Sequence, residues 1–261
     1  MDAYDDDNQI EKFNRMIDDI KKIGSHIMRL ESNFRNLELD MHNDIFYISK
    51  LFSIRQFKQL HAMFKLEDNE NHILISRSMF EGAVYLSSFL KDNNLASNWR
   101  NYAYVVDKIR MDSSCDKNEI PENVKRILLS KQEVIDSFKD KNGKFYPSWI
   151  KGKSIKNLSE IAGLGEFYKK YYSPMSEFHH WGTKSFGIRY GCLNSDVEEL
   201  TSAEIKLESL NAWCMSISSI LSVLSILADY AQNDNLIKKI SKLQENLSKI
   251  DGTITTKIKY V

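Results

Sequence analysis

Two charged residues stand alone in an otherwise uncharged, apolar segment. Between residues 71 and 90, the only charged residues are Arg77 and Glu81. Positions four residues apart lie on one face of a helix, and the apolar residues around them indicate that this face is turned inward. Arginine comes first, whereas an exposed helix is stabilised best by glutamate first. The pair therefore predicts either a buried ion pair that fixes helix packing or part of an anion-binding site.

A second group of polar residues lies on a short predicted helix that begins at Ser173 and Pro174. Ser176 and His180 share a face of this helix, whereas His179 points about 100° away. Only one of the two histidines can therefore face a given pocket. Each histidine can also be a partly buried imidazole with satisfied hydrogen bonds and no chemical role.

Three segments, taken in order, give the chain a resemblance to a known family. Residues 77–81 have the form R-x-x-x-E, residues 149–154 the form W-x-x-G-K-S and residues 172–180 the form Y-S-x-x-S-x-x-x-H. The set resembles an uncharacterised bacterial family of helical domains of unknown function, over roughly residues 66–227. The resemblance implies that Arg77, Glu81, Ser176 and His180 converge, and it would place an apolar residue at His179. The family has no established activity, so the resemblance implies a site and not a reaction.

Convergent arginine, glutamate, serine and histidine side chains suit chemistry on an anionic group. We expect Arg77, Glu81 and His180 to be catalytic. An arginine grips phosphate or carboxylate through parallel hydrogen bonds, a histidine transfers protons near neutral pH, and a glutamate orients either of them. The residues expected to contact the substrate are Ser176, His179 and Tyr172. This chemistry requires no metal and no cofactor.

The arginine and histidine combination is also similar to the sites of the HEPN superfamily, helical-bundle ribonucleases that use the 2′-hydroxyl of RNA. Those sites usually have the form R-x(4–6)-H, and this chain has two formal matches, from Arg35 to His42 and from Arg55 to His61. The resemblance implies a metal-independent ribonuclease or nucleotide-acting protein of stress or phage defence. The alternative is a non-enzymatic interaction module in which the Arg–Glu–His network locks helix packing and another surface binds a protein partner.

Other chemistries find less support in the sequence. Glu177-x-x-His180 is half of the ligand set of a di-iron bundle, but no second Glu-x-x-His occurs. Gly163 and Gly165 follow no predicted strand, so no phosphate-binding loop is expected. Ser176 with His180 lacks the orienting acid and the oxyanion hole that a nucleophilic triad requires.

The composition favours an all-α fold. Of the 261 residues 42% are hydrophobic, and only 3 are proline and 10 glycine, so the residues that punctuate strand-rich folds are scarce. We expect a single helical-bundle domain over residues 1–250 and a C-terminal tail, 251–261, whose alternating β-branched residues are typical of a short strand. Basic and acidic residues number 36 each, which gives no global electrostatic case for nucleic-acid binding but leaves a local basic groove open.

The cysteines and the N-terminus are typical of a cytoplasmic protein. The three cysteines form no C-x-x-C pair, and the acidic N-terminus lacks the basic and apolar regions of a signal peptide. Residues 209–228 carry no charge and are long enough to span a membrane. They include six serines, however, and their apolar residues recur every three or four positions. This pattern predicts a buried central helix and no membrane partner.

Capping residues and apolar periodicity predict the remaining elements. Long helices are expected at residues 3–23, with Gly24 as a break, at 34–66 and at 71–91, followed by an aromatic helix around Trp99. Dimerisation through the long helices is a further expectation.

The second half of the chain is expected to contain shorter elements. A polar loop at 112–119 leads into a charged helix or arm at 121–141 and then into short helices at 145–181, one of them capped by Ser154. Residues 182–197 form a long connection, and Thr201 with Glu204 forms a capping box that opens the central helix.

Overall fold

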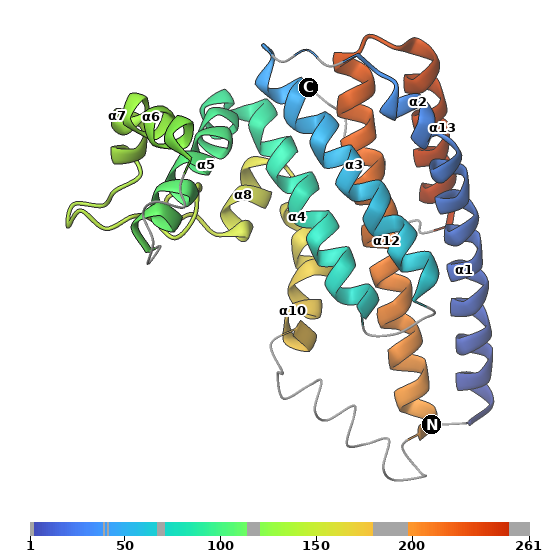
Figure 1. The fold of residues 1–261 in the computed structure, drawn as a ribbon. Coiled ribbons are helices and arrows are strands. Elements are labelled where there is room, and N and C mark those ends of the chain that lie inside the picture. Colours follow the sequence, from blue (N-terminus) through green and yellow to red (C-terminus); the bar gives the residue numbers. More distant parts are fainter. Residues whose placement is uncertain are drawn as a thin grey trace.

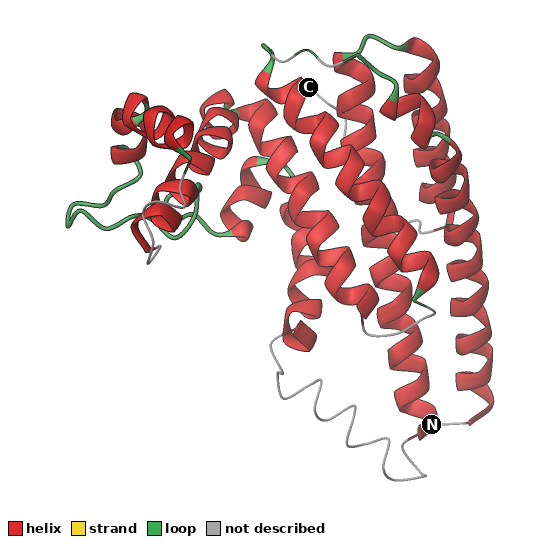
Figure 2. Cartoon of the chain, viewed as in Figure 1, coloured by secondary structure: helices red, strands yellow, loops and turns green. Residues whose placement is uncertain are grey.

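The protein is built from α-helices, as its composition predicts (Figure 1, Figure 2). The computed structural model describes residues 3–38, 40, 42–66, 71–113, 121–179 and 198–250. Within these ranges no β-strand forms, although an isolated β-bridge joins Lys139 and Phe145. The helices in chain order are α1 (Ala3–Arg29), α2 (Glu31–Arg35), α3 (Asp44–Lys65), α4 (Asn71–Lys91), α5 (Asn93–Ser113), α6 (Glu122–Ser130), α7 (Gln132–Asp136), α8 (Ile155–Ile161), α9 (Gly165–Phe167), the π-helical turn η2 (Tyr168–Tyr172), α10 (Ser173–His179), α12 (Glu198–Tyr230) and α13 (Asp234–Ile250).

Helix α12 forms the centre of the bundle, as predicted. It packs against α1, α3, α4 and α13, so both ends of the chain lie around it (Figure 1). Its part Lys206–Tyr230 is long and apolar enough to cross a membrane, but 83% of the most apolar stretch is buried inside the bundle. Length and composition alone are weak evidence for a membrane span, because the core helix of a globular protein meets the same criteria.

The predicted start of this central helix is wrong. The helix begins at Glu198, so Thr201 lies inside it and does not open it. Glu198, Glu199 and Leu200 precede the expected cap, and glutamate and leucine are good helix formers that extend the helix in the N-terminal direction.

Gly24 does not break the first helix, contrary to the prediction. Helix α1 continues through it to Arg29. A Cβ atom at Gly24 would lie 3.1 Å from the Phe64 ring and 3.2 Å from Cδ1 of Ile217. Glycine inside a helix costs about 1 kcal/mol relative to alanine, but here it lets α1 approach α3 and α12 closely. Gly24 is therefore a packing residue.

The helix predicted for residues 34–66 is interrupted, so that prediction is also wrong. Helix α2 ends at Arg35 and α3 begins at Asp44, where the Asn43 side chain accepts a hydrogen bond of 3.0 Å from the backbone N–H of Phe46. Lys50 Nζ donates to three carbonyl oxygens at the end of α2 and just beyond it, at 2.5, 2.6 and 2.9 Å. The last carbonyl groups of a helix lack helical partners, and the buried lysine satisfies them.

Helix α4, which carries Arg77 and Glu81, has the predicted bounds Asn71–Lys91. It packs against α3, α5, α8, α10 and α12. Ser154 caps α8 in a reciprocal capping box with Asn157, which confirms the predicted cap. After α8, the short segments α9, η2 and α10 follow one another and bring residues 172–176 against α4.

The remaining predictions are met only in part. Helices α6 and α7 pack on α5 and form the expected arm, at the far left of Figure 1. Helix α5 extends to Ser113, so residues 112 and 113 of the predicted loop are helical, and residues 114–120 lie outside the described ranges. The same holds for the connection at 182–197 and the tail at 251–261.

Candidate functional site

Arg77 and Glu81 lie on one face of α4, but they do not form the direct ion pair that one reading of the sequence predicts. Arg77 is buried, with 8% of its surface exposed, and Glu81 is half-buried. The hydroxyl of Tyr172 lies between them. It accepts a hydrogen bond of 2.9 Å from Arg77 Nη2 and donates one of 2.6 Å to Glu81 Oε1. The two charged groups are therefore joined through a phenol.

Tyr172 is held in place by aromatic packing at the end of the π-helical turn. Its ring lies 5.3 Å from the Phe80 ring and 5.1 Å from the Tyr168 ring, between centroids. The guanidinium of Arg77 lies 4.5 Å from the centre of the Tyr172 ring, a cation–π contact. π-Helical turns are rare in proteins, and those that occur are often found at functional sites. This turn places the hydroxyl between the two charged residues of α4.

The Tyr172 phenol stays protonated at neutral pH. Burial raises its pKa well above the usual value, the hydrogen bond to Glu81 and the charge of Glu81 raise it further, and Arg77 opposes these effects only in part. A protonated phenol can accept from Arg77 and donate to Glu81 at the same time. The directions of the two hydrogen bonds are thus fixed.

Arg77 retains an unused hydrogen-bond donor. Its Nη1 atom is buried and has no hydrogen-bond partner among the described residues. A buried donor without a partner is unfavourable by about 1–3 kcal/mol, and by more if it is charged. A guanidinium offers five N–H groups in a planar fork that matches phosphate or carboxylate. Tyr172 fixes one side of the Arg77 fork, and no residue of the described ranges binds the other.

The other predicted site residues are described only in part. Ser176 is half-buried on α10. Its neighbour Met175 is buried, and Ser76 Oγ lies 3.8 Å from Met175 Sδ, so α10 faces α4. The backbone of His179 ends α10, but its side chain and the whole of His180 lie outside the described residues. The structure therefore brings together Arg77, Tyr172 and Glu81 and leaves the predicted place of the histidines untested.

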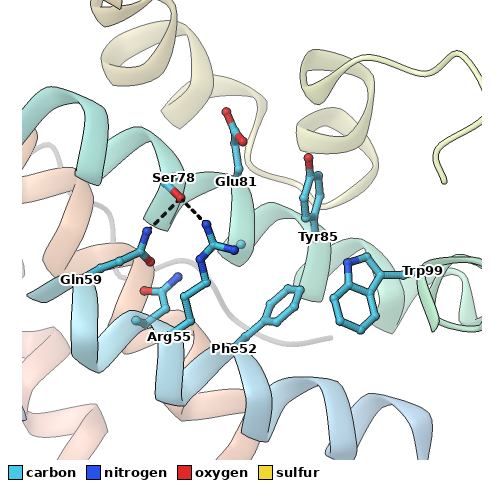
Figure 3. A pocket seen from close by; sticks show the side chains of 9 residues that line it. Phe52, Arg55, Gln59, Ser78, Glu81, Tyr85 and Trp99 are labelled. Carbon is cyan, nitrogen blue, oxygen red and sulfur yellow. Dashed lines mark hydrogen bonds between the residues drawn. The ribbon is translucent and has the colours of Figure 1, made fainter. Parts of the chain in front are cut away.

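A cavity of about 140 Å³ beside Glu81 was not recognised in the sequence (Figure 3). It lies between α3, α4 and α5, and its lining residues are Phe52, Arg55, Gln56, Gln59, Ser78, Glu81, Gly82, Tyr85 and Trp99. The four residues from α3 and the four from α4 each have the spacing i, i+3, i+4, i+7, which defines one helical face. That spacing is the signal by which the sequence could have revealed them.

Glu81 belongs to both the hydrogen-bonded network and the cavity lining, and its charge raises the pKa of a tyrosine in each, Tyr172 and Tyr85. Burial and the Glu81 charge raise the pKa of Tyr85 to about 12, so this second phenol is also protonated at neutral pH. In Figure 3, Glu81 and Tyr85 project in the same direction from α4, while Arg55 and Gln59 reach from α3 toward Ser78.

Neither formal R-x(4–6)-H match places both its arginine and its histidine in the cavity or in the Arg77 network. Arg35 and His61 both bind Glu31, at 2.6 and 2.8 Å. Burial acts to raise the pKa of Glu31, but the hydrogen bonds from His61 and Arg35 outweigh it and lower that pKa. Arg55 lines the cavity, and His42 is exposed. Within the described ranges, no group of three or more His, Cys, Asp and Glu side chains is arranged to hold a metal ion.

A protein-family model matches residues 45–197, which is more than half of the chain. The chain belongs to the family of unknown function DUF5677. The DUF5677 segment begins in α3 and includes α4, η2 and α10, so it contains Arg77, Glu81, Tyr172 and every residue that lines the cavity. No curated protein and no solved structure matches the chain. Membership of DUF5677 supports the predicted family resemblance and assigns no activity.

Proposed function

We propose that this protein is a metal-independent enzyme that acts on phosphate groups of RNA or of a nucleotide, with Arg77 as the phosphate-binding residue. The observation that carries the proposal is the buried Nη1 of Arg77, which has no hydrogen-bond partner among the described residues although Tyr172 holds Nη2. Preorganised donors aimed at an anionic group are the most common source of catalytic stabilisation in phosphate chemistry.

The remaining residues have supporting roles in this proposal. Tyr172 fixes the plane of the Arg77 guanidinium, and Glu81 orients Tyr172 by accepting a hydrogen bond from its hydroxyl. His180 transfers protons, and Ser176 and His179 contact the substrate. In RNA cleavage the 2′-oxygen attacks the adjacent phosphorus and the bond from phosphorus to the 5′-oxygen of the next nucleotide breaks. The 2′-hydroxyl gives up a proton and the leaving 5′-oxygen gains one, and a histidine suits both transfers. We place the activity in the cytoplasm, in stress or phage defence.

The test is cleavage of labelled RNA and hydrolysis of nucleotides by the full chain in the presence of EDTA. Arg77→Lys keeps the charge but loses the planar fork, so we expect activity to fall about 10- to 100-fold, as for a lost hydrogen bond to a charged group. The activity of the His180→Ala variant should fall by a similar or larger factor. Arg126→Lys, at an exposed position on α6 without an ion pair in the structure, is the matched control. Unchanged activity in both site variants contradicts the proposal.

A second function is favoured by the same hydrogen bonds, because they join α4 to η2 in the interior. In this second function the network serves solely to fix the packing of the helices. The protein is then a non-enzymatic module that binds a protein partner or a second copy of the chain. Stability separates the two functions. If the network is structural, Arg77→Met should lower the free energy of unfolding by about 3 kcal/mol or more. In a ligand site it should leave stability unchanged or raise it, because the unpartnered Nη1 is removed.

A further inference from the structure

The cavity beside Glu81 has a polar end and an aromatic end (Figure 3). Arg55, Gln59 and Ser78 lie at one end, and Phe52 and Trp99 lie side by side at the other. The Phe52 and Trp99 rings meet edge to face, with centroids 5.3 Å apart. Aromatic walls with a few placed polar groups are typical of a site for a small organic ligand.

The amide of Gln56 provides an acceptor that no residue in the described ranges uses. Its Nε2 donates to the backbone oxygen of Met79 at 2.7 Å. A carbonyl oxygen can only accept, so this bond fixes the orientation of the amide. Its Oε1 is buried, in a side chain that is 2% exposed, and has no partner. Gln56 lines the cavity, so a ligand N–H group that reaches this oxygen would satisfy it.

Two further groups on α4 extend the hydrogen-bonding pattern. Glu81 lines the cavity and uses one carboxylate oxygen for Tyr172, and because a carboxylate offers about four acceptor positions, further acceptor capacity remains. Ser78 Oγ accepts from Gln59 at 2.8 Å and from Arg55 at 3.4 Å, so its own proton remains available as a donor. The cavity therefore offers two acceptors and at least one donor.

The size and shape of the cavity suit one flat ring system. Its volume of about 140 Å³ is below the range of roughly 300–1,000 Å³ for pockets that enclose drug-sized ligands. Gly82 lies in the wall, and a Cβ atom there would lie 3.2 Å from Gln56 Nε2. The absence of this side chain leaves room next to the amide. An alkyl ammonium ion fits less well, because Arg55 would repel it.

We propose that this cavity binds a nucleobase, with Gln56 and Glu81 accepting hydrogen bonds from its N–H groups and the joined aromatic surface of Phe52 and Trp99 packing against it. Guanine fits best among the common bases, because a ring N–H and an amino group lie side by side on its edge, with an oxygen beside them for Ser78. Unstacked bases are generally recognised by packing against aromatic side chains and by hydrogen bonds to their Watson–Crick edges.

This inference rests on the proposed function in one respect: base and phosphate would belong to one ligand. Glu81 and Arg77 are four residues apart, which is a rise of about 6 Å along α4. A ribose can span that separation between a base at the cavity and a phosphate at Arg77. The substrate class is then a guanine nucleotide or a guanine in single-stranded RNA.

The test is isothermal titration of the full chain with guanosine, inosine and guanosine monophosphate. Inosine lacks only the 2-amino group of guanosine, so we expect it to bind at least about tenfold more weakly. Gln56→Met and Trp99→Leu should each weaken guanosine binding about tenfold or more. Gln244→Met on α13 is the control, and thermal unfolding verifies that each variant is folded. Ser78→Ala, at a half-buried position, provides a further variant if Gln56→Met fails to fold.

The outcomes separate the two proposals. Guanosine carries no phosphate, so Arg77→Met should not change its binding but should weaken guanosine monophosphate. If both ligands bind Arg77→Met as they bind the original chain, the phosphate role fails and the base site stands. The base site is overturned if guanosine does not bind at millimolar concentration, if inosine binds equally, or if folded Trp99→Leu and Ser78→Ala bind guanosine unchanged.

Discussion

The hydroxyl of Tyr172 holds two charged side chains of α4, and replacement of Tyr172 by phenylalanine removes that single oxygen. The ring stays, with its contacts to Phe80 and Tyr168. Arg77 Nη2 and Glu81 Oε1 each lose their hydrogen-bond partner. Every change in stability then reports on the bridge and not on lost packing.

The expected loss follows from the two hydrogen bonds. A hydrogen bond to a charged group contributes about 1.5–3 kcal/mol net, which gives an upper limit of about 6 kcal/mol for the pair. Glu81 is half-buried and regains water when the bond is lost, so its share is small. Arg77 is buried, so its Nη2 atom does not regain water when the bond is lost, and it accounts for most of the expected loss. We expect a loss of about 3 kcal/mol in the free energy of unfolding, equivalent to a fall of about 6–12 °C in Tm for a chain of this length.

Urea denaturation followed by circular dichroism measures this loss. Tyr168→Phe is the matched control, because Tyr168 stacks on Tyr172 but its hydroxyl has no hydrogen-bond partner in the described ranges. The control should change stability by less than about 0.5 kcal/mol. The reasoning is refuted if Tyr172→Phe is no less stable than the control. In the double variant with Arg77→Met, the effects of the two changes on stability should not be additive, because both changes remove the same hydrogen bond.

Three further predictions concern the scaffold around the site. Lys50→Met removes the side-chain donor of three carbonyl oxygens, and among the described residues only that of Phe34 keeps a backbone donor, the N–H of Leu37. We therefore expect urea denaturation to show a loss of about 2–4 kcal/mol; an unchanged midpoint would contradict this. In Gly24→Ala, helix propensity stabilises the protein by about 1 kcal/mol, whereas overpacking against Phe64 and Ile217 destabilises it by about 1–3 kcal/mol. We therefore expect no gain in stability, and a higher Tm in thermal unfolding would disprove the packing role. The raised pKa of Tyr85 means that between pH 10.0 and about 12 the folded state holds a proton that the unfolded state has lost. Stability should therefore fall as the pH rises through this window, and pH-dependent unfolding of Tyr85→Phe should show a shallower fall.

The amino-acid sequence by itself determined the helical class, the bounds of α4 and the burial of α12. These properties follow from local information: scarce proline and glycine, capping residues, and apolar residues that recur every three or four positions. The same periodicity placed Arg77 and Glu81 on one inward face. Each property depends on neighbours within a few turns of the same helix, so it can be read without knowledge of the rest of the fold.

Tertiary contacts decided what those side chains do. The hydroxyl that joins Arg77 to Glu81 comes from a residue 91 positions after Glu81, and no local pattern relates the two. Gly24 resembles a helix break until Phe64 and Ile217 are seen to fill the space beside it. The cavity has the same cause: its faces on α3 and α4 are each visible as a spacing, but which residues meet across the gap depends on how the two helices pack. That packing is fixed by the fit of all the side chains between them, and this is information the order of residues along one helix does not contain.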